Sequence, residues 1–231
     1  MFGKPKNAEL PLWRVISSAA TALLFGLVAV ISAPQLLAFP HKANIGSTTV
    51  YAENPIDAAQ LKTILLRSDR LLAATGLYKS PVGTRLFLTN GGWRWRLLSL
   101  TSHKAFALTR PSLDLISDGA IFNRADPAQD HIFNNMDVSR KRSLSGVIAH
   151  ERTHMLVRRH FGMLRSLTFP GWKSEGYADY VAQESSLTQT QTDAFNKAGI
   201  DHPAILYFEG RKRVAAIMAK NGNSVDQLFA K

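Results

Sequence analysis

The first long apolar run in the chain covers residues 15–33, with the sequence VISSAATALLFGLVAVISA. No Asp, Glu, Lys or Arg occurs from Val15 to His41, and Pro34 follows the run directly. A helix needs roughly 20 apolar residues to cross the hydrocarbon core of a bilayer. The pattern therefore predicts a single transmembrane helix at residues 15–33.

A cleaved signal peptide is the main alternative interpretation of this run. The apolar core of a signal peptide is usually about 7–15 residues long and precedes a small-residue cleavage site. The run here is longer, and Pro34 disfavours cleavage after Ala33. An uncleaved anchor is therefore the preferred hypothesis, ahead of a signal peptide and of a buried helix in a soluble domain.

The charges beside the run predict its orientation. Lys4, Lys6 and Arg14 precede it, whereas the first charges that follow it are of both signs. Positive residues flanking a membrane span stay on the cytoplasmic side. We therefore expect a cytoplasmic tail and anchor at residues 1–40, and an extracytoplasmic domain at residues 41–231 that faces the periplasm or the extracellular space.

The rest of the chain alternates between helical and strand patterns. Residues 40–54 are interpreted as a short polar linker, and apolar residues at intervals of three and four predict a packing helix at 55–76. Short strands are expected at 86–89, 105–109, 120–122 and 131–134. Further helices are expected at 175–185, 188–198, 203–220 and 224–230. Together these elements predict an α+β domain with a small mixed sheet.

The sequence Trp-Arg-Trp-Arg at residues 93–96 has two interpretations. Interleaved Trp and Arg side chains suit a lipid surface, where amphipathic aromatic rings gather at headgroup level. The two Trp side chains could equally pack on the core and leave the Arg side chains between them exposed. The pattern alone does not choose between these alternatives.

The candidate chemistry begins with His150-Glu151-x-x-His154, in a helical pattern for which Ser143 is a candidate N-cap. Residues four apart on a helix lie on one face. Two imidazoles placed in this way can bind one metal ion, and the Glu beside the first can contact a water on that ion. Paired histidines can also be ordinary buried or surface residues, so the hypothesis requires a third ligand. Catalytic zinc has three protein ligands and an open position, and Zn²⁺ is the expected ion.

Glu175 is the candidate third ligand. It lies far enough after His154 for a turn and a second helix that runs back beside the first. Asp179 is four residues further along and faces the same way. One carboxylate can bind the metal while the other accepts the free N–H of a ligand histidine and fixes its tautomer.

The motif His150-Glu151-x-x-His154 followed by Trp172-x-x-Glu175-Gly176-x-Ala178-x-Tyr180 resembles the gluzincin metallopeptidases, especially their peptidase MA-like branch. The resemblance covers roughly residues 143–182. It implies a zincin-like fold in which His150, His154 and Glu175 bind Zn²⁺, Glu151 is the general base and Asp179 orients His150. It also implies that an edge strand pairs with the substrate, a role we assign to the predicted strand at 120–122 or at 131–134.

His160 is a rival third ligand. Its distance from His154 matches the metzincin pattern, but that pattern requires Gly at the third position after the second His, where this chain has Val157. Without Gly the helix continues, and His160 then points away from the direction of His154. We therefore expect His160 in the last turn of the helix, where positive charge suits the helix dipole, with Gly162 ending the helix.

Composition narrows the classes of function. The chain has 231 residues, a formal net charge of +11 and no Cys, which excludes disulfides, thiol nucleophiles and cysteine metal sites. Basic clusters at 140–142, 158–159 and 211–213 suit nucleic acid, an anionic surface, or plain solvation of helix faces. No nucleic-acid-binding motif accompanies them. An extracytoplasmic domain favours anionic lipid or cell-wall polymer, and no nucleic acid partner is expected.

These observations predict a membrane-anchored zinc metallopeptidase that hydrolyses peptide or protein substrates through a zinc-activated water. Glu151 is expected to transfer the proton, and Tyr177, Tyr180 or Tyr207 to donate a hydrogen bond to the oxyanion. The alternative is a catalytically inactive zincin-fold protein that binds partners or serves as a scaffold at the membrane. The presence of Glu151 argues against this alternative, because an inactive site has no use for a general base.

Overall fold

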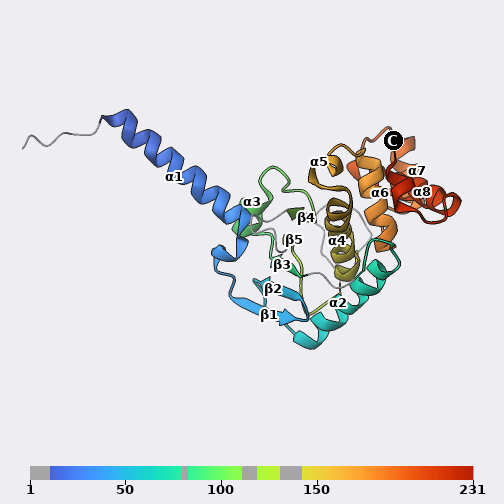
Figure 1. Ribbon diagram of the computed structural model, residues 1–231, viewed down its shortest axis with the longest axis horizontal. Helices are drawn as coiled ribbons and strands as arrows, with labels where there is room; N and C mark the ends of the chain where they lie inside the picture. The colour runs from blue at the N-terminus through green and yellow to red at the C-terminus, as the bar shows by residue number, and fades with distance from the viewer. Residues whose placement is uncertain (1–10, 80–82, 111–118, 131–141, 231) are drawn as a thin grey trace, which may run out of the picture.

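The computed structural model describes residues 11–79, 83–110, 119–130 and 142–230 of the chain. Over these ranges the protein is a mixed α+β domain with one helix projecting from it (Figure 1). The helical elements are α1 (Leu12–Ser32), η1 (Pro34–Leu37), α2 (Ala58–Ala73), α3 (Trp93–Ser99), α4 (Leu144–Phe161), α5 (Met163–Ser166), α6 (Gly171–Ala182), α7 (Gln189–Lys197), α8 (Pro203–Lys220) and α9 (Val225–Phe229). The strands are β1 (His41–Ile45), β2 (Thr48–Ala52), β3 (Thr84–Thr89), β4 (Ala107–Arg110) and β5 (Gly119–Asn123). The predicted strand at 131–134, and with it Lys4, Lys6, Arg140 and Lys141, lies outside the described residues.

The five strands form one mixed sheet in the order β1-β2-β3-β5-β4. The three central strands are parallel, whereas β1 pairs antiparallel with β2 and β4 pairs antiparallel with β5. The predictions of a small mixed sheet and of an α+β fold are thus confirmed. Within the described ranges β1 and β4 form the two edges of the sheet.

The prediction of a polar linker at residues 40–54 was wrong. This segment forms the β1–β2 hairpin, whose register leaves Gly46 and Ser47 as the turn. Gly46 has a φ of +59°, which glycine adopts at little cost. Val50 and Ala52 are fully buried in the core. The short strands and their polar Thr and Asn residues concealed the alternation that would have predicted a hairpin.

The two faces of the sheet are covered by different helices. Successive side chains of a strand point to opposite faces. Leu86 and Phe122 belong to a core that includes residues of α2 and α4. Phe87 and Ile121 point the other way and pack with Trp95 of α3. The sheet therefore separates the long helix α4 from the region where α1 enters the domain.

The N-terminal helix α1 is long and apolar enough to cross a membrane, with a mean hydropathy of 2.2 in its most apolar window. None of its residues is buried, and Figure 1 shows it projecting away from the domain. Its last turn reaches the sheet, because Val30 packs against the cluster formed by Phe87, Trp95 and Ile121. The predicted apolar helix is confirmed, and it begins at Leu12, ahead of the predicted start.

The Trp-Arg-Trp-Arg segment lies in α3, and its two tryptophans have different environments. Trp95 is 2% exposed and packs on the sheet, whereas Trp93 is 57% exposed. Arg94 between them forms an ion pair with Glu53, with 2.7 Å between Nη1 and Oε1. The core-packing interpretation therefore holds for Trp95 but not for Trp93, which is exposed.

The helices after α4 form a second layer. This layer contains Glu175, Asp179 and Tyr207 among the predicted site residues. At the crossing of α6 and α8, a Cβ added to Gly176 would lie 2.4 Å from the carbonyl carbon of Gly210. Only glycine at both positions allows this approach, which holds α8 against α6. The predicted helices at 188–198, 203–220 and 224–230 are confirmed as α7, α8 and α9 to within about one residue. The helix predicted at 175–185 is α6, which begins earlier, at Gly171.

Candidate metal site

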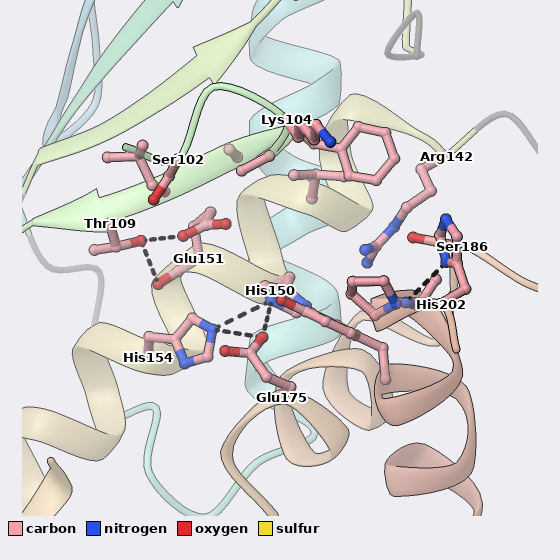
Figure 2. A pocket seen from close by; sticks show the side chains of 18 of the residues that line it. Ser102, Lys104, Thr109, Arg142, His150, Glu151, His154, Glu175, Ser186 and His202 are labelled. Atoms are coloured by element: carbon pink, nitrogen blue, oxygen red, sulfur yellow. Dashed lines mark hydrogen bonds and ion pairs between the residues drawn. The ribbon is translucent and has the colours of Figure 1, made fainter. Parts of the chain in front are cut away.

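Two helices bring the predicted ligands together. His150 and His154 lie one turn apart on α4, and Glu175 comes from α6, which packs against α4. The side-chain atoms able to bind a metal in these three residues all lie within 4.8 Å of one another. Figure 2 shows the two imidazoles and the carboxylate converging on one point. The group could hold a metal ion, as the spacing in the sequence predicted.

The distances within the group suit a small tetrahedral ion. The Nε2 atoms of His150 and His154 are 3.2 Å apart, and they lie 3.2 Å and 3.5 Å from Oε2 of Glu175. Ligand atoms about 2.0–2.1 Å from a tetrahedral Zn²⁺ lie roughly 3.3–3.4 Å from one another. Two imidazole nitrogens and one carboxylate oxygen are also a donor set that zinc accepts.

The local sequence of α4 explains why its histidines are fixed. Ser143 caps the helix, accepting a hydrogen bond from the backbone N–H of Gly146 at 2.9 Å, as predicted. Glu184 accepts hydrogen bonds from the backbone N–H and the hydroxyl of Ser143. His150 and Glu151 are almost completely buried. The helix that carries both histidines is therefore held at its start by a cap that is itself tied to the segment after α6.

Asp179 sets the tautomer of His150. Its Oδ1 lies 2.8 Å from Nδ1 of His150 and 2.9 Å from Nη2 of Arg142. Burial alone would raise the pKa of Asp179, but Arg142 and His150 lower it, so the carboxylate is ionised. It accepts the Nδ1–H of His150, and this leaves Nε2 as the nitrogen that faces His154 and Glu175. The role expected of Asp179 thus matches its geometry, and Arg142 is an addition that the sequence did not predict.

The electrostatics of the group favour a bound cation. Burial lowers the pKa of His150, but its hydrogen bonds with Asp179 and Glu175 outweigh burial and raise the pKa to about 10. For Glu175, burial favours the neutral form and raises the pKa. His154 and His150 outweigh burial and hold the pKa of Glu175 far below its ordinary value. The carboxylates that stabilise a positive charge on the imidazole would stabilise a metal ion at the same place.

We expect Asp179→Asn to weaken zinc binding by roughly 10–100-fold, the usual effect of removing the outer partner of a ligand histidine. The neutral amide no longer stabilises the charged site, and it leaves the buried Arg142 without its carboxylate partner. Competition with a chromophoric chelator measures the affinity. Asp193→Asn, a change of an Asp on α7 far along the chain from these ligands, is the control. Equal zinc affinity for the two variants would contradict the role of Asp179.

Glu151 lies beside the ligands and faces the sheet. One carboxylate oxygen accepts a hydrogen bond from the hydroxyl of Thr109 on β4, and the same hydroxyl lies 3.1 Å from the backbone oxygen of Glu151 (Figure 2). Thr109 and Glu151 line one cavity of about 690 Å³ together with all three candidate ligands. The position of Glu151 suits a proton acceptor for a water on the metal.

Among the described residues, the strand beside this cavity is not the one at 120–122, which was one of the two that we had assigned. Residues 120–122 belong to β5, which lies between β3 and β4 and is not an edge. The strand at 131–134 lies outside the described residues. The edge strand that lines the cavity is β4, which contains part of the predicted strand at 105–109. The assignment of 120–122 was wrong because strand order depends on pairing across the sheet, which the local pattern does not carry.

Among the three candidate oxyanion donors, the structure brings Tyr207 into the cavity. Tyr207 of α8 lines it, and its ring stacks on His150 with 6.2 Å between the ring centroids. Burial, followed by the charge of Glu175, raises the pKa of Tyr207, so its hydroxyl remains a hydrogen-bond donor. Tyr177 instead packs in the helical core, and neither Tyr177 nor Tyr180 lines the cavity.

His160 lies apart from the ligand group. It is in the last turn of α4, and its Nε2 lies 2.7 Å from Oδ1 of Asp226. Gly162 ends the helix with a φ of +85°, as predicted from the sequence. The structure therefore places His160 at the helix end, and Glu175 takes the position next to His150 and His154.

Several polar residues that line the cavity were not predicted as site residues, among them Lys104, Thr109, Arg142 and His202. These four come from a loop, an edge strand, the approach to α4 and the start of α8. No motif links them to the metal-binding turn, so only the three-dimensional arrangement could have found them. The basic cluster at 140–142, interpreted as a solvated surface or an anion-binding face, contributes the buried Arg142 to the site.

Comparison of the chain with protein-family models, with curated proteins and with solved structures finds no match. The class of protein is therefore defined by the geometry of the described residues. It is a mixed α+β protein with an apolar N-terminal helix able to span a membrane and a His-His-Glu group that could hold a metal ion.

Proposed function

We propose that this protein is a membrane-anchored zinc metallopeptidase with a zincin-like catalytic domain of the gluzincin type. The observation that carries the proposal is the convergence of His150, His154 and Glu175 in one cavity with the carboxylate of Glu151. A site that only stored a metal or used it structurally would need no acid–base group beside three protein ligands, and structural zinc sites have four.

The mechanism assigns a task to each residue. His150, His154 and Glu175 would hold the zinc ion, which would supply Lewis acidity to a water and to the scissile carbonyl. Glu151 accepts the proton of that water and delivers it to the leaving amine. Tyr207 donates a hydrogen bond to the oxygen on which negative charge develops.

The edge strand β4 is the element that we propose aligns the substrate. An extended peptide can add to the free edge of a sheet through main-chain hydrogen bonds. β4 is paired with β5 on one side, and its Thr109 contacts Glu151. A peptide lying along β4 would therefore pass directly in front of the metal group and its general base.

The anchor places this reaction at a membrane. We propose that α1 spans the bilayer with Arg14 and the N-terminal residues in the cytoplasm and the catalytic domain outside, following the positive-inside rule. Tethering the domain to the bilayer through α1 would keep the enzyme on the same surface as substrates at the membrane. No cytoplasmic partner such as nucleic acid is expected.

The test of the proposed function uses the purified full chain in detergent with a chemically unfolded protein as substrate. We expect release of new amino termini, loss of release after chelation, and recovery on adding about one equivalent of Zn²⁺ but not Mg²⁺. Hydrolysis that persists in excess chelator would contradict the proposal. A chain that binds zinc but hydrolyses no peptide would instead be the inactive scaffold protein.

A further inference from the structure

The segment that follows α1 is tied to the domain by side-chain hydrogen bonds. Arg94 of α3 donates hydrogen bonds to the backbone oxygens of Leu37 and Ala38, at 3.0 and 3.1 Å, while it pairs with Glu53. These contacts fix the segment that follows α1. With α1 in a bilayer, the surface of the domain next to this segment would lie nearest the lipid.

The sheet register identifies this surface. His41, at the start of β1, pairs with Ala52, and Ala52 pairs with Leu88 near the carboxyl end of β3. Thr89 in turn pairs with Asn123 at the carboxyl end of β5. The exit from α1 and the carboxyl ends of β3 and β5 thus lie along one edge of the domain, where these strands end. Figure 1 shows α3 beside the point where α1 meets the domain.

A second cavity, of about 470 Å³, opens along the same edge. It is lined by Gly91, Trp95, Arg96, His103, Asn123 and Arg124. Its ionisable lining residues are all basic. His103 is held in place because Ser99 lies 2.8 Å from its Nδ1 and Trp95 donates a hydrogen bond to its backbone oxygen at 3.0 Å. The cavity therefore has a built wall and not only flexible surface side chains.

Two apolar side chains at the ends of α3, the helix that supplies Trp95 and Arg96 to this cavity, are exposed. Trp93 is 57% exposed and Leu100 is 40% exposed, at the two ends of α3. The guanidinium of Arg94 lies 4.6 Å from the ring of Trp93 and holds it in place. A fixed, exposed Trp beside basic side chains is the composition found where a protein surface meets lipid headgroups.

We infer that this edge of the domain, formed by Trp93, Leu100 and the cavity around Arg96, Arg124 and His103, binds the phosphate of an anionic phospholipid headgroup. Arg guanidinium groups match the geometry of phosphate oxygens, and Trp93 and Leu100 enter the interface beside them. The occupant is lipid and not a free anion, because α1 delivers the edge to the bilayer. This inference rests on the proposed membrane span of α1 but does not depend on hydrolysis.

The site has a consequence for the orientation of the metal cavity. Ser102 and Lys104 line the metal cavity, while His103 between them lines the headgroup cavity. The two cavities therefore share the segment at residues 102–104. Headgroup binding would hold the metal cavity close to the bilayer and favour substrates that are themselves at the membrane.

The absence of Cys from the chain allows a sharp test. A fluorophore is attached to Leu100→Cys in the full chain, which is reconstituted in phosphatidylcholine vesicles with or without phosphatidylglycerol and with headgroup-labelled quencher lipid. We expect quenching at least about two-fold stronger in the anionic vesicles, and a fall towards the neutral value in 0.5 M salt. The label on Leu66→Cys of α2, which is also exposed, should show neither change.

Charge reversal then distinguishes binding at this cavity from general attraction of the basic protein to anionic vesicles. Arg96→Glu with Arg124→Glu should abolish the difference between anionic and neutral vesicles, whereas Lys62→Glu with Arg70→Glu on α2, which changes the net charge equally, should preserve it. Equal quenching in both vesicles, or equal effects of the two double variants, would overturn the inference. The salt dependence is measured on the chain without charge reversal. That measurement therefore tests the inference even where a charge-reversed variant fails to fold.

Discussion

The variant Glu151→Gln is expected to bind zinc as the unmutated chain does and to hydrolyse peptide bonds at least roughly 10²–10⁴-fold more slowly, the usual contribution of general acid–base catalysis. The amide keeps the shape of the side chain and can still hydrogen bond to Thr109. It cannot accept a proton at neutral pH. Zinc content and the rate of release of amino termini, measured on the same preparation, check both halves of the expectation.

A matched control for this variant is Glu209→Gln on α8, whose carboxylate pairs with Lys212 at the surface. It changes the net charge by the same amount and should leave hydrolysis and zinc content unchanged. Full hydrolytic activity in Glu151→Gln would remove Glu151 from the mechanism. Loss of zinc as well as activity would mean that the side chain supports the ligands, and the proton transfer would then need another residue.

The sequence could predict the placement of His150 and His154 because all of the information that it needs is local. Four-residue spacing places His150 and His154 on one face whatever surrounds the helix, and the cap at Ser143 is a contact between near neighbours. The same holds for α1, whose length and lack of charge are properties of one segment. Glu175 required one further step, the assumption that α6 lies beside α4.

The missed features all depend on contacts between distant segments. Arg142 is opposite Asp179 because the approach to α4 lies next to α6, and Thr109 meets Glu151 because β4 is an edge of the sheet. The β1–β2 hairpin was missed for a related reason. Its strands are stabilised by pairing with β3, so their own short and polar sequences carry little of the signal.

The second large expected effect is a loss of zinc on changing Glu175, which we propose as the third ligand in preference to His160. Glu175→Gln is expected to lose most bound zinc, because a neutral amide oxygen replaces an ionised carboxylate whose pKa both histidines hold very low. The loss of affinity should exceed the roughly 10–100-fold expected when only the outer partner of a ligand is changed. Metal analysis of the dialysed full chain in detergent measures zinc per chain.

His160→Gln is the control for this experiment, because His160 was the rival candidate from the sequence and its side chain instead contacts Asp226. It should retain about one zinc per chain, the stoichiometry of a single three-ligand site. The reverse result, with zinc lost from His160→Gln and kept in Glu175→Gln, would require α4 to end before His160 and turn it back towards His154. Gly162 ends the helix only after Phe161, so the backbone of α4 argues against that arrangement. Equal retention of zinc in both variants would mean that His150 and His154 bind it without Glu175, and the gluzincin-type site would have to be abandoned.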